Sequence, residues 1–157
     1  MTAHYVEQTP KTLYLHWTGV DSYSRTFTDY HTCITVRRSW FKPWTWVAEV
    51  KRMHPYDKAL HHHTYRMNTN AIAISCCGAG RNTPIRKEQV EVMALEAARA
   101  CVRYNIPIDS DHVQTHAESA IRLNYYPERV DFDKRGDELR AKIRYYANKI
   151  KAGELKP

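Results

Sequence analysis

Residues 71–76 read Ala-Ile-Ala-Ile-Ser-Cys, an apolar run that follows the polar segment Asn-Thr-Asn at 68–70 and is closed off by Gly78. A short apolar run between turn-forming residues predicts a buried β-strand. The same reasoning predicts earlier strands where other apolar or β-branched runs occur, at residues 13–17, 31–36 and 44–50. A further short strand is expected at 112–115, directly before His116.

Two helices are predicted after these first four strands. Thr83 and Pro84 have the residue types favoured at a helix N-cap and first helical position, and apolar residues at helical spacing continue to Val102. A second amphipathic helix is predicted from about residue 137 to 151. Strands on both sides of a helix predict an α/β fold, with a single mixed central β-sheet flanked by helices. We expect residues 1–157 to form one domain that includes the last helix.

The amino-acid composition and charge exclude several classes of protein. The 157 residues include 24 Lys and Arg against 17 Asp and Glu, which gives a formal charge of +7, and 43% are hydrophobic. This is a globular composition and excludes a disordered chain. The first eleven residues lack a signal-peptide pattern, so we expect synthesis in the cytoplasm without a signal peptide. The excess of basic over acidic residues favours an anionic partner. Because no nucleic-acid-binding motif is present, we expect no nucleic acid partner.

Three residues could ligate a metal ion, although their spacing alone does not identify a site. His16 ends the first predicted strand, His116 follows the last one, and Asp131 lies further on. Separately, each is also typical of a core histidine or a surface carboxylate. Because no two of them are four residues apart, no short-range zinc motif exists.

Five short segments together are more specific. They read Leu-His-Trp-Thr, Asp-Tyr-His-Thr, His-Thr-Tyr-Arg-Met-Asn-Thr-Asn-Ala-Ile-Ala-Ile-Ser, Thr-His-Ala-Glu and Glu-Arg-Val-Asp, at 15–18, 29–32, 63–75, 115–118 and 128–131. In this order they resemble the zinc-dependent N-acetylmuramoyl-L-alanine amidase family, which includes phage lysins and peptidoglycan-recognition proteins. The third segment is the most specific part of the resemblance, which covers most of the chain.

The resemblance implies roles for individual residues. It implies Zn²⁺ as the cofactor, with His16, His116 and Asp131 as ligands, and Asp133 is a nearby alternative to Asp131. It implies catalytic roles for Tyr30, His63 and Arg129, and supporting or substrate-binding roles for Glu118, Ser75 and Asn68. Two imidazoles and one carboxylate would leave the fourth position of a tetrahedral zinc open for water, as in catalytic sites.

Two departures from the family pattern bear on the proton transfers. Ser75 stands where many bacterial relatives carry a catalytic glutamate, so a glutamate base at that position is not available. Arg129 stands where many relatives have lysine, and arginine cannot act as an acid because it keeps its proton in proteins. The sequence does not identify the general base.

The resemblance implies hydrolysis of the amide between the lactyl group of N-acetylmuramic acid and L-alanine of the stem peptide, by zinc-activated water. We expect a phage or prophage endolysin that is a monomer and acts on the periplasmic cell wall after release or export. The alternatives are a non-catalytic peptidoglycan-binding module and a secreted antibacterial amidase effector. Peptidoglycan is the expected substrate. The basic helix at 137–151 could also contact an anionic membrane or lipopolysaccharide.

Overall fold

The structure is a computed structural model that describes residues 6–61, 63–64, 67–124 and 131–157. In chain order its elements are β1 (Thr12–Trp17), β2 (Thr32–Arg38), β3 (Trp46–Arg52), β4 (Ala71–Cys76), α1 (Lys87–Tyr104), β5 (Val113–Thr115), α2 (His116–Arg122) and α3 (Gly136–Lys151).

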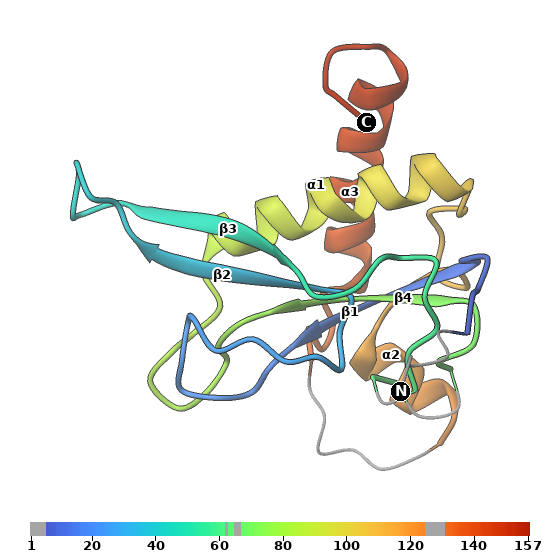
Figure 1. The fold of residues 1–157 in the computed structure, drawn as a ribbon, viewed down its shortest axis with the longest axis horizontal. Helices are drawn as coiled ribbons and strands as arrows, with labels where there is room; N and C mark the ends of the chain where they lie inside the picture. The colour runs from blue at the N-terminus through green and yellow to red at the C-terminus, as the bar shows by residue number, and fades with distance from the viewer. Residues whose placement is uncertain (1–5, 62, 65–66, 125–130) are drawn as a thin grey trace.

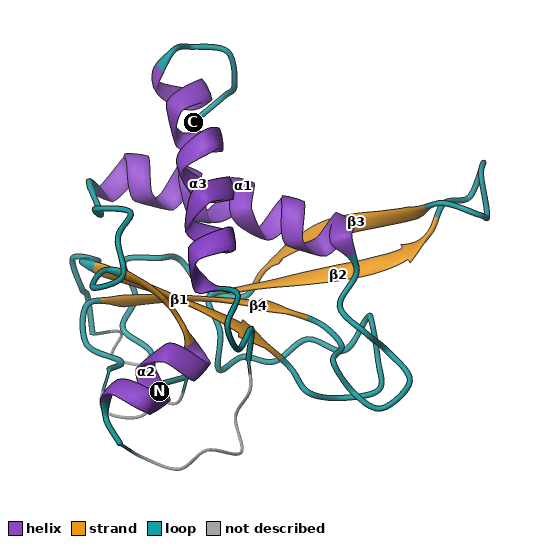
Figure 2. Ribbon diagram, turned by 180° about the vertical axis from the view of Figure 1, so that it is seen from behind, coloured by secondary structure: helices purple, strands orange, loops and turns teal. Residues whose placement is uncertain are grey.

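The five strands form one mixed sheet in the order β3-β2-β4-β1-β5. Strand β1 lies parallel to both β4 and β5, β2 is parallel to β4, and only the β2–β3 pair is antiparallel. Helices α1 and α3 lie on one side of this sheet and α2 lies on the other (Figures 1 and 2). The expected α/β fold with a mixed central sheet and flanking helices is confirmed.

The two faces of the sheet carry different kinds of side chain. Because side chains alternate along a strand, Leu13 and Leu15 of β1 point to one face, and Tyr14 and His16 point to the other. The first face joins the main apolar core beneath α1 and α3, together with Ile72 and Ile74 of β4. The second face holds a small cluster of Tyr30, Cys33, Ala73 and Cys77, which leaves room for polar side chains. His16 therefore lies on the face that the large core does not use.

The predicted start of the first helix was wrong by three residues. The helix begins at Lys87 after the N-cap Arg86, whose backbone N–H donates to Gln89 Oε1 at 3.0 Å. Thr83 is unavailable as a cap because its hydroxyl lies 3.1 Å from the Val20 carbonyl, in the preceding turn. The helix ends before Asn105, which adopts a left-handed conformation at φ 53°.

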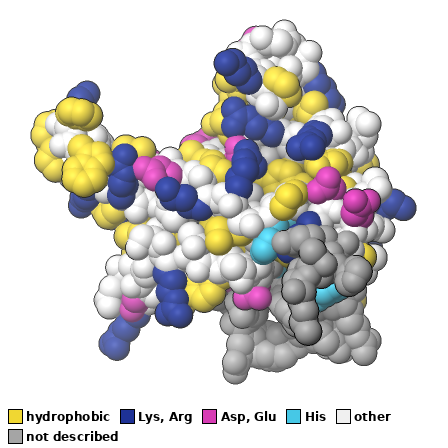
Figure 3. Space-filling model, viewed as in Figure 1, with side chains coloured by type: hydrophobic (Ala, Val, Ile, Leu, Met, Phe, Trp, Pro, Cys, Tyr) yellow, Lys and Arg dark blue, Asp and Glu magenta, His cyan; other side chains and the backbone are white. Residues whose placement is uncertain are grey.

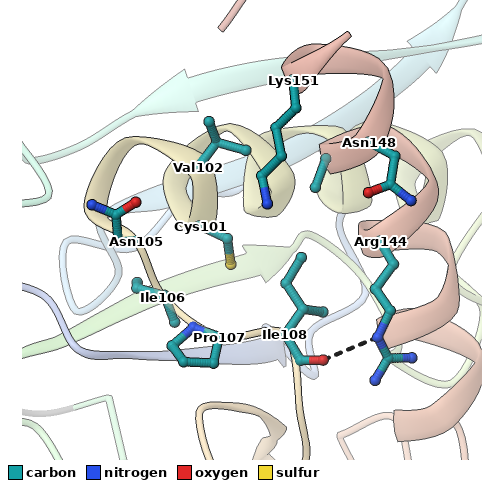
Figure 4. Close-up of a pocket in the computed structure, with 10 residues that line it drawn as sticks. Cys101, Val102, Asn105, Ile106, Pro107, Ile108, Arg144, Asn148 and Lys151 are labelled. Atoms are coloured by element: carbon teal, nitrogen blue, oxygen red, sulfur yellow. Dashed lines mark hydrogen bonds between the residues drawn. The ribbon is translucent and has the colours of Figure 1, made fainter.

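A pocket between the helices lies away from His16. It has a volume of about 390 Å³ and opens between the end of α1 and α3, lined by residues such as Cys101, Ile106 and Lys151 (Figure 4). The Arg144 Nε–H donates to the Ile108 carbonyl at 3.0 Å across this region. None of the predicted site residues lines it. Among the described helices, none combines the length and apolarity that crossing a membrane requires.

Candidate active site

The fold brings together three potential metal ligands that are far apart in the sequence. His16 lies near the end of β1, His116 is the first residue of α2, and Asp131 precedes α3. All three side chains are buried, and their donor atoms lie within 4.8 Å of one another. In the part of the chain that the structure describes, no other group of three such residues is close enough to hold a metal ion.

The distances match one face of a coordination tetrahedron. His16 Nδ1 lies 3.2 Å from His116 Nδ1, and Asp131 Oδ2 lies 3.3 Å from His116 Nδ1 and 3.6 Å from His16 Nδ1. Zinc ligands bound tetrahedrally at about 2.0–2.1 Å are separated by roughly 3.3–3.4 Å. The three atoms therefore surround a point at which a zinc-sized ion would fit.

Asp131 supplies the negative charge of this cluster. Burial alone would raise its pKa, but hydrogen bonds from His116 and His16 outweigh burial and lower the pKa below the usual range. Asp131 Oδ1 is also buried and has no hydrogen-bond partner among the described residues. An ionised carboxylate at this depth is costly unless cations balance it, which a divalent ion would do.

The turn after Asp131 decides between the two candidate aspartates. Phe132 adopts a positive φ of 56° and is fully buried, with its ring centroid 5.1 Å from that of Trp17. This anchor keeps Asp131 turned inward, while Asp133 is exposed to solvent. The geometry favours Asp131 as the ligand. Phe132 escaped the sequence reasoning because nothing in its residue type signals a left-handed conformation.

His116 owes its position to the N-terminus of α2, a helix that the sequence reasoning did not predict. The Thr115 hydroxyl accepts the Glu118 N–H at 3.1 Å, and Glu118 Oε2 accepts the Thr115 N–H at 2.8 Å. This is a capping box, which fixes the first turn and with it the His116 backbone. The Glu118 carboxylate also binds both terminal nitrogens of Arg140, at 2.9 and 2.8 Å. Glu118 thus stabilises the helix that carries His116.

Thr64 connects two histidines of the site, a role that the sequence reasoning missed. Its hydroxyl lies 3.2 Å from His16 Nε2 and 2.9 Å from His63 Nδ1. The Thr64 N–H donates to Asn68 Oδ1 at 2.9 Å, and the Asn68 amide donates to the His61 carbonyl. Asn68 therefore braces the loop that carries His63 and Thr64. In the sequence, the only sign of this role was that Thr64 directly follows His63 within a family motif.

His63 and Tyr30 lie beside the candidate metal ligands. The His63 ring centroid is 5.8 Å from that of His16, and the Tyr30 ring centroid is 5.1 Å from it. Burial, followed by the nearby histidines, lowers the pKa of His63 to about 2, so this imidazole is neutral near pH 7. Its Nε2 is buried and has no hydrogen-bond partner within the described residues.

Ser75 is the β4 residue paired in register with His16, and its buried hydroxyl likewise lacks a hydrogen-bond partner among described residues. It therefore lies beside His16 on the neighbouring strand, and its supporting or substrate-binding role stays a prediction. Arg129, the remaining predicted catalytic residue, lies outside the described residues.

A protein-family model identifies the family of this chain. The model for N-acetylmuramoyl-L-alanine amidase matches residues 6–129. The chain belongs to the N-acetylmuramoyl-L-alanine amidase family. The match to the amidase model includes His16 and His116 and stops two residues before Asp131.

Solved structures share the fold of this amidase. A mutant endolysin from Bacillus subtilis is 16% identical with a TM-score of 0.60, covering 89% of each chain. The Staphylococcus aureus hydrolase AmiA in complex with its ligand is 15% identical with a TM-score of 0.61, covering 99% of this chain and 84% of AmiA. The catalytic domain of XlyA is 13% identical with a TM-score of 0.61, covering 89% of this chain and 90% of that domain. A comparison with curated protein sequences found no significant match.

Proposed function

We propose that this amidase uses a zinc ion held by His16, His116 and Asp131 to cleave the bond between N-acetylmuramic acid and L-alanine of the stem peptide. The observation that carries the proposal is the triangle of two Nδ1 atoms and one Oδ2 atom with edges of 3.2 to 3.6 Å, within a chain of the amidase family. When bound, zinc supplies Lewis-acid activation of water and of the scissile carbonyl.

The hydrogen bonds around Thr64 determine which ring nitrogen of His63 carries the proton. If His16 presents its Nδ1 lone pair to the ion, its ring proton lies on Nε2 and is donated to Thr64 Oγ1, 3.2 Å away. The Thr64 hydroxyl then donates to His63 Nδ1 at 2.9 Å, which leaves the His63 proton on Nε2. We propose that this N–H donates to the substrate carbonyl as negative charge develops on it.

Tyr30 is proposed to orient the attacking water or to stabilise the same oxygen. Its ring packs against the His16 ring and is only slightly exposed, which holds the phenol in one place. Arg129 is proposed to add positive charge near the transition state or to bind a stem-peptide carboxylate.

Digestion of purified peptidoglycan, followed by mass spectrometry, tests the proposal. We expect new L-alanine amino termini from the wild type, their loss with a chelator, and recovery when zinc is restored. His16→Ala should abolish the product, whereas Asp133→Ala, an exposed aspartate two residues from a ligand, should not. If the wild type holds stoichiometric zinc yet releases nothing from several wall types, the chain is a non-catalytic peptidoglycan-binding module.

We further propose that the amidase is a phage or prophage endolysin that reaches the periplasmic cell wall after release. The fold shared with an endolysin from Bacillus subtilis supports this origin. A secreted antibacterial effector is the alternative, and co-culture of a natural producer strain with susceptible cells separates the two. Death of the neighbouring cells while the producer survives favours the effector, whereas lysis of the producer itself favours the endolysin.

The contact of α3 with an anionic membrane or lipopolysaccharide stays a prediction. Several of its cations have acidic partners within the chain, since Arg140 binds Glu118 and Lys149 binds Glu154. The same holds for Lys142, which pairs with Glu91. These ion pairs reduce the charge that α3 can offer to an external surface.

A further inference from the structure

The connection between β2 and β3 exposes large aromatic side chains. We define residues 39–45 as the hairpin tip. In it Trp40 is 82% exposed, Phe41 is 93% exposed and Trp44 is 73% exposed. The hairpin extends well beyond the rest of the molecule (Figures 1 and 2), and hydrophobic side chains gather at its end, next to basic ones (Figure 3). None of these aromatic rings contributes to the core.

The hairpin tip is held in shape by its own hydrogen bonds. The Ser39 N–H donates to the Thr45 carbonyl at 2.9 Å, which closes the loop. Both the N–H and the hydroxyl of Thr45 donate to the Lys42 carbonyl at 2.8 Å, and the Lys42 N–H donates to Ser39 Oγ at 3.3 Å. The aromatic side chains are therefore presented on an ordered loop, so a partner need not order the backbone on binding.

Basic residues surround the aromatic ones. Arg37 and Arg38 end β2 just before the tip, and Lys42 lies inside it. Within residues 37–49 the only acid is Glu49, which is paired with Arg37 at 2.6 Å. Three cations against one acid give the end of the hairpin a positive charge.

We propose that the hairpin tip inserts into the headgroup region of a bilayer that contains anionic phospholipids. Tryptophan is enriched at membrane interfaces because its ring is apolar and its N–H can still contact water or headgroups. Phe41 has no polar atom and lies between the two tryptophans in sequence, where it would enter deepest. The cations behind the tip would meet anionic headgroups.

Other occupants fit these observations less well. A second copy of the chain would bring the same patch against itself in a two-fold dimer, and Arg37, Arg38 and Lys42 of both copies would then be crowded together. A sugar ring stacks on one aromatic face but needs several hydrogen-bonding groups beside it, whereas the side-chain oxygens of Ser39 and Thr45 are engaged within the tip, by the Lys42 N–H and the Lys42 carbonyl. A bilayer requires neither a groove nor a second polar surface.

Vesicle binding by the full chain tests the proposal independently of the hydrolytic activity. Wild type is mixed with vesicles of zwitterionic phosphatidylcholine, with or without 30% phosphatidylglycerol, and its binding is measured by co-sedimentation. Quenching of tryptophan fluorescence by brominated lipid reports insertion. We expect binding to the anionic vesicles and at least tenfold weaker binding by the variant Trp40→Ser, Phe41→Ser, Trp44→Ser.

Two pairs of charge substitutions distinguish the hairpin tip from α3 as the membrane contact. Arg38→Gln with Lys42→Gln should weaken binding and reduce its dependence on salt, because the charge contribution is removed while the aromatic rings remain. Arg144→Gln with Lys151→Gln, which changes exposed cations of α3, should bind like wild type. The triple variant should retain wild-type thermal unfolding and activity on soluble wall fragments, since the tip contacts neither the core nor the site. Both charge pairs should retain that activity, because none of the four residues lies in the site.

Each contrary outcome rejects the proposal. Absence of wild-type binding, or equal binding by the triple variant, shows that the tip does not insert. Loss of binding only in the α3 variant assigns the membrane contact to α3 instead. If the triple variant loses co-sedimentation with insoluble peptidoglycan but not with vesicles, the tip binds the wall. If it converts a dimer to a monomer in sedimentation velocity, the tip binds a second copy.

Discussion

Thr64 is the residue on which the orientation of two site histidines depends, because its hydroxyl lies within hydrogen-bond distance of both His16 and His63. Thr64→Val keeps the shape of the side chain and removes this link. We expect zinc affinity or turnover to fall about 10- to 100-fold, the usual loss when a partner of a metal-binding histidine is removed. Competition with a zinc-binding dye and turnover on muropeptides measure the two effects.

Thr64→Ser is the matched control for this prediction, because serine restores the hydroxyl without the methyl group. It should recover most of the lost affinity and turnover. Equal behaviour of the valine variant and the wild type would mean that neither histidine needs the hydroxyl to hold its tautomer.

His31 should make the stability of the fold depend on pH. Its Nδ1 accepts the Ala73 N–H at 3.0 Å, and its Nε2–H donates to the Lys58 carbonyl at 2.7 Å. Burial outweighs the latter hydrogen bond and lowers the pKa from 6.5 to about 4. Between these values the unfolded chain binds the proton and the folded chain does not, so stability is full above about pH 6.5 and falls toward pH 4.

The expected loss from this one histidine is about 3 kcal/mol, at about 1.4 kcal/mol per pKa unit. Urea unfolding of the zinc-loaded protein between pH 4.5 and 7 measures it. His31→Gln should be less stable than wild type at pH 7, and this difference should shrink as the pH falls. A difference that stays constant across the range would show that His31 has the same pKa in both states.

At the scale of elements, Arg140 joins α3 to the two elements that deliver His116. Its guanidinium donates to the Val113 carbonyl of β5 at 2.9 Å and binds the Glu118 carboxylate of α2 through two nitrogens. Gly136 lies against the same carboxylate: a Cβ there would lie 2.0 Å from Glu118 Oε1, so a larger residue would displace the Glu118 side chain that Arg140 binds. The first turn of α2 is therefore positioned from α3 as well as by its own capping box.

Arg140→Met should destabilise the fold by about 3 kcal/mol or more, because it leaves a partly buried carboxylate without its partner. Arg144→Met, one turn further along α3 at an exposed position, should cost less than about 1 kcal/mol. Urea unfolding compares the two. Similar losses in both variants would show that the Arg140 contacts contribute no more to the free energy of unfolding than those of an exposed arginine.

The elements also show what the sequence could and could not predict. The β4 run from Ala71 to Cys76 is apolar except for Ser75 and turn residues bound it, so both ends were predictable. Helix α2 has only seven residues and no apolar stripe long enough to show a helical period, so it was missed although Thr115 and Glu118 form its capping box. The fold could be predicted from the sequence, and the family motifs named the three residues that the fold brings together, His16, His116 and Asp131. Contacts such as Thr64 with His16 could not, because they join residues 48 apart in the chain.

At the scale of the whole molecule, the proposed metal ion would add one direct link between segments that are far apart in the chain. His16 and His116 are 100 residues apart, and Asp131 lies a further 15 residues along. Any ion that binds the folded chain but not the unfolded one stabilises the folded state, by about 4 kcal/mol at a free concentration of a thousand times Kd. For a domain of this size, that corresponds to a rise in Tm of roughly 8–16 °C.

We therefore expect zinc to raise the Tm of the chelator-treated protein by about this amount in differential scanning calorimetry, and magnesium to have little effect, since nitrogen ligands favour zinc. Asp131→Asn should abolish most of the rise, because it removes the charged ligand while keeping its shape, whereas Asp133→Asn should keep it. An equal rise in wild type and Asp131→Asn would place the stabilising ion elsewhere. A rise confined to chains with an intact His16, His116 and Asp131 would mean that one bound ion links the strand, the helix and the turn into a single cooperative unit.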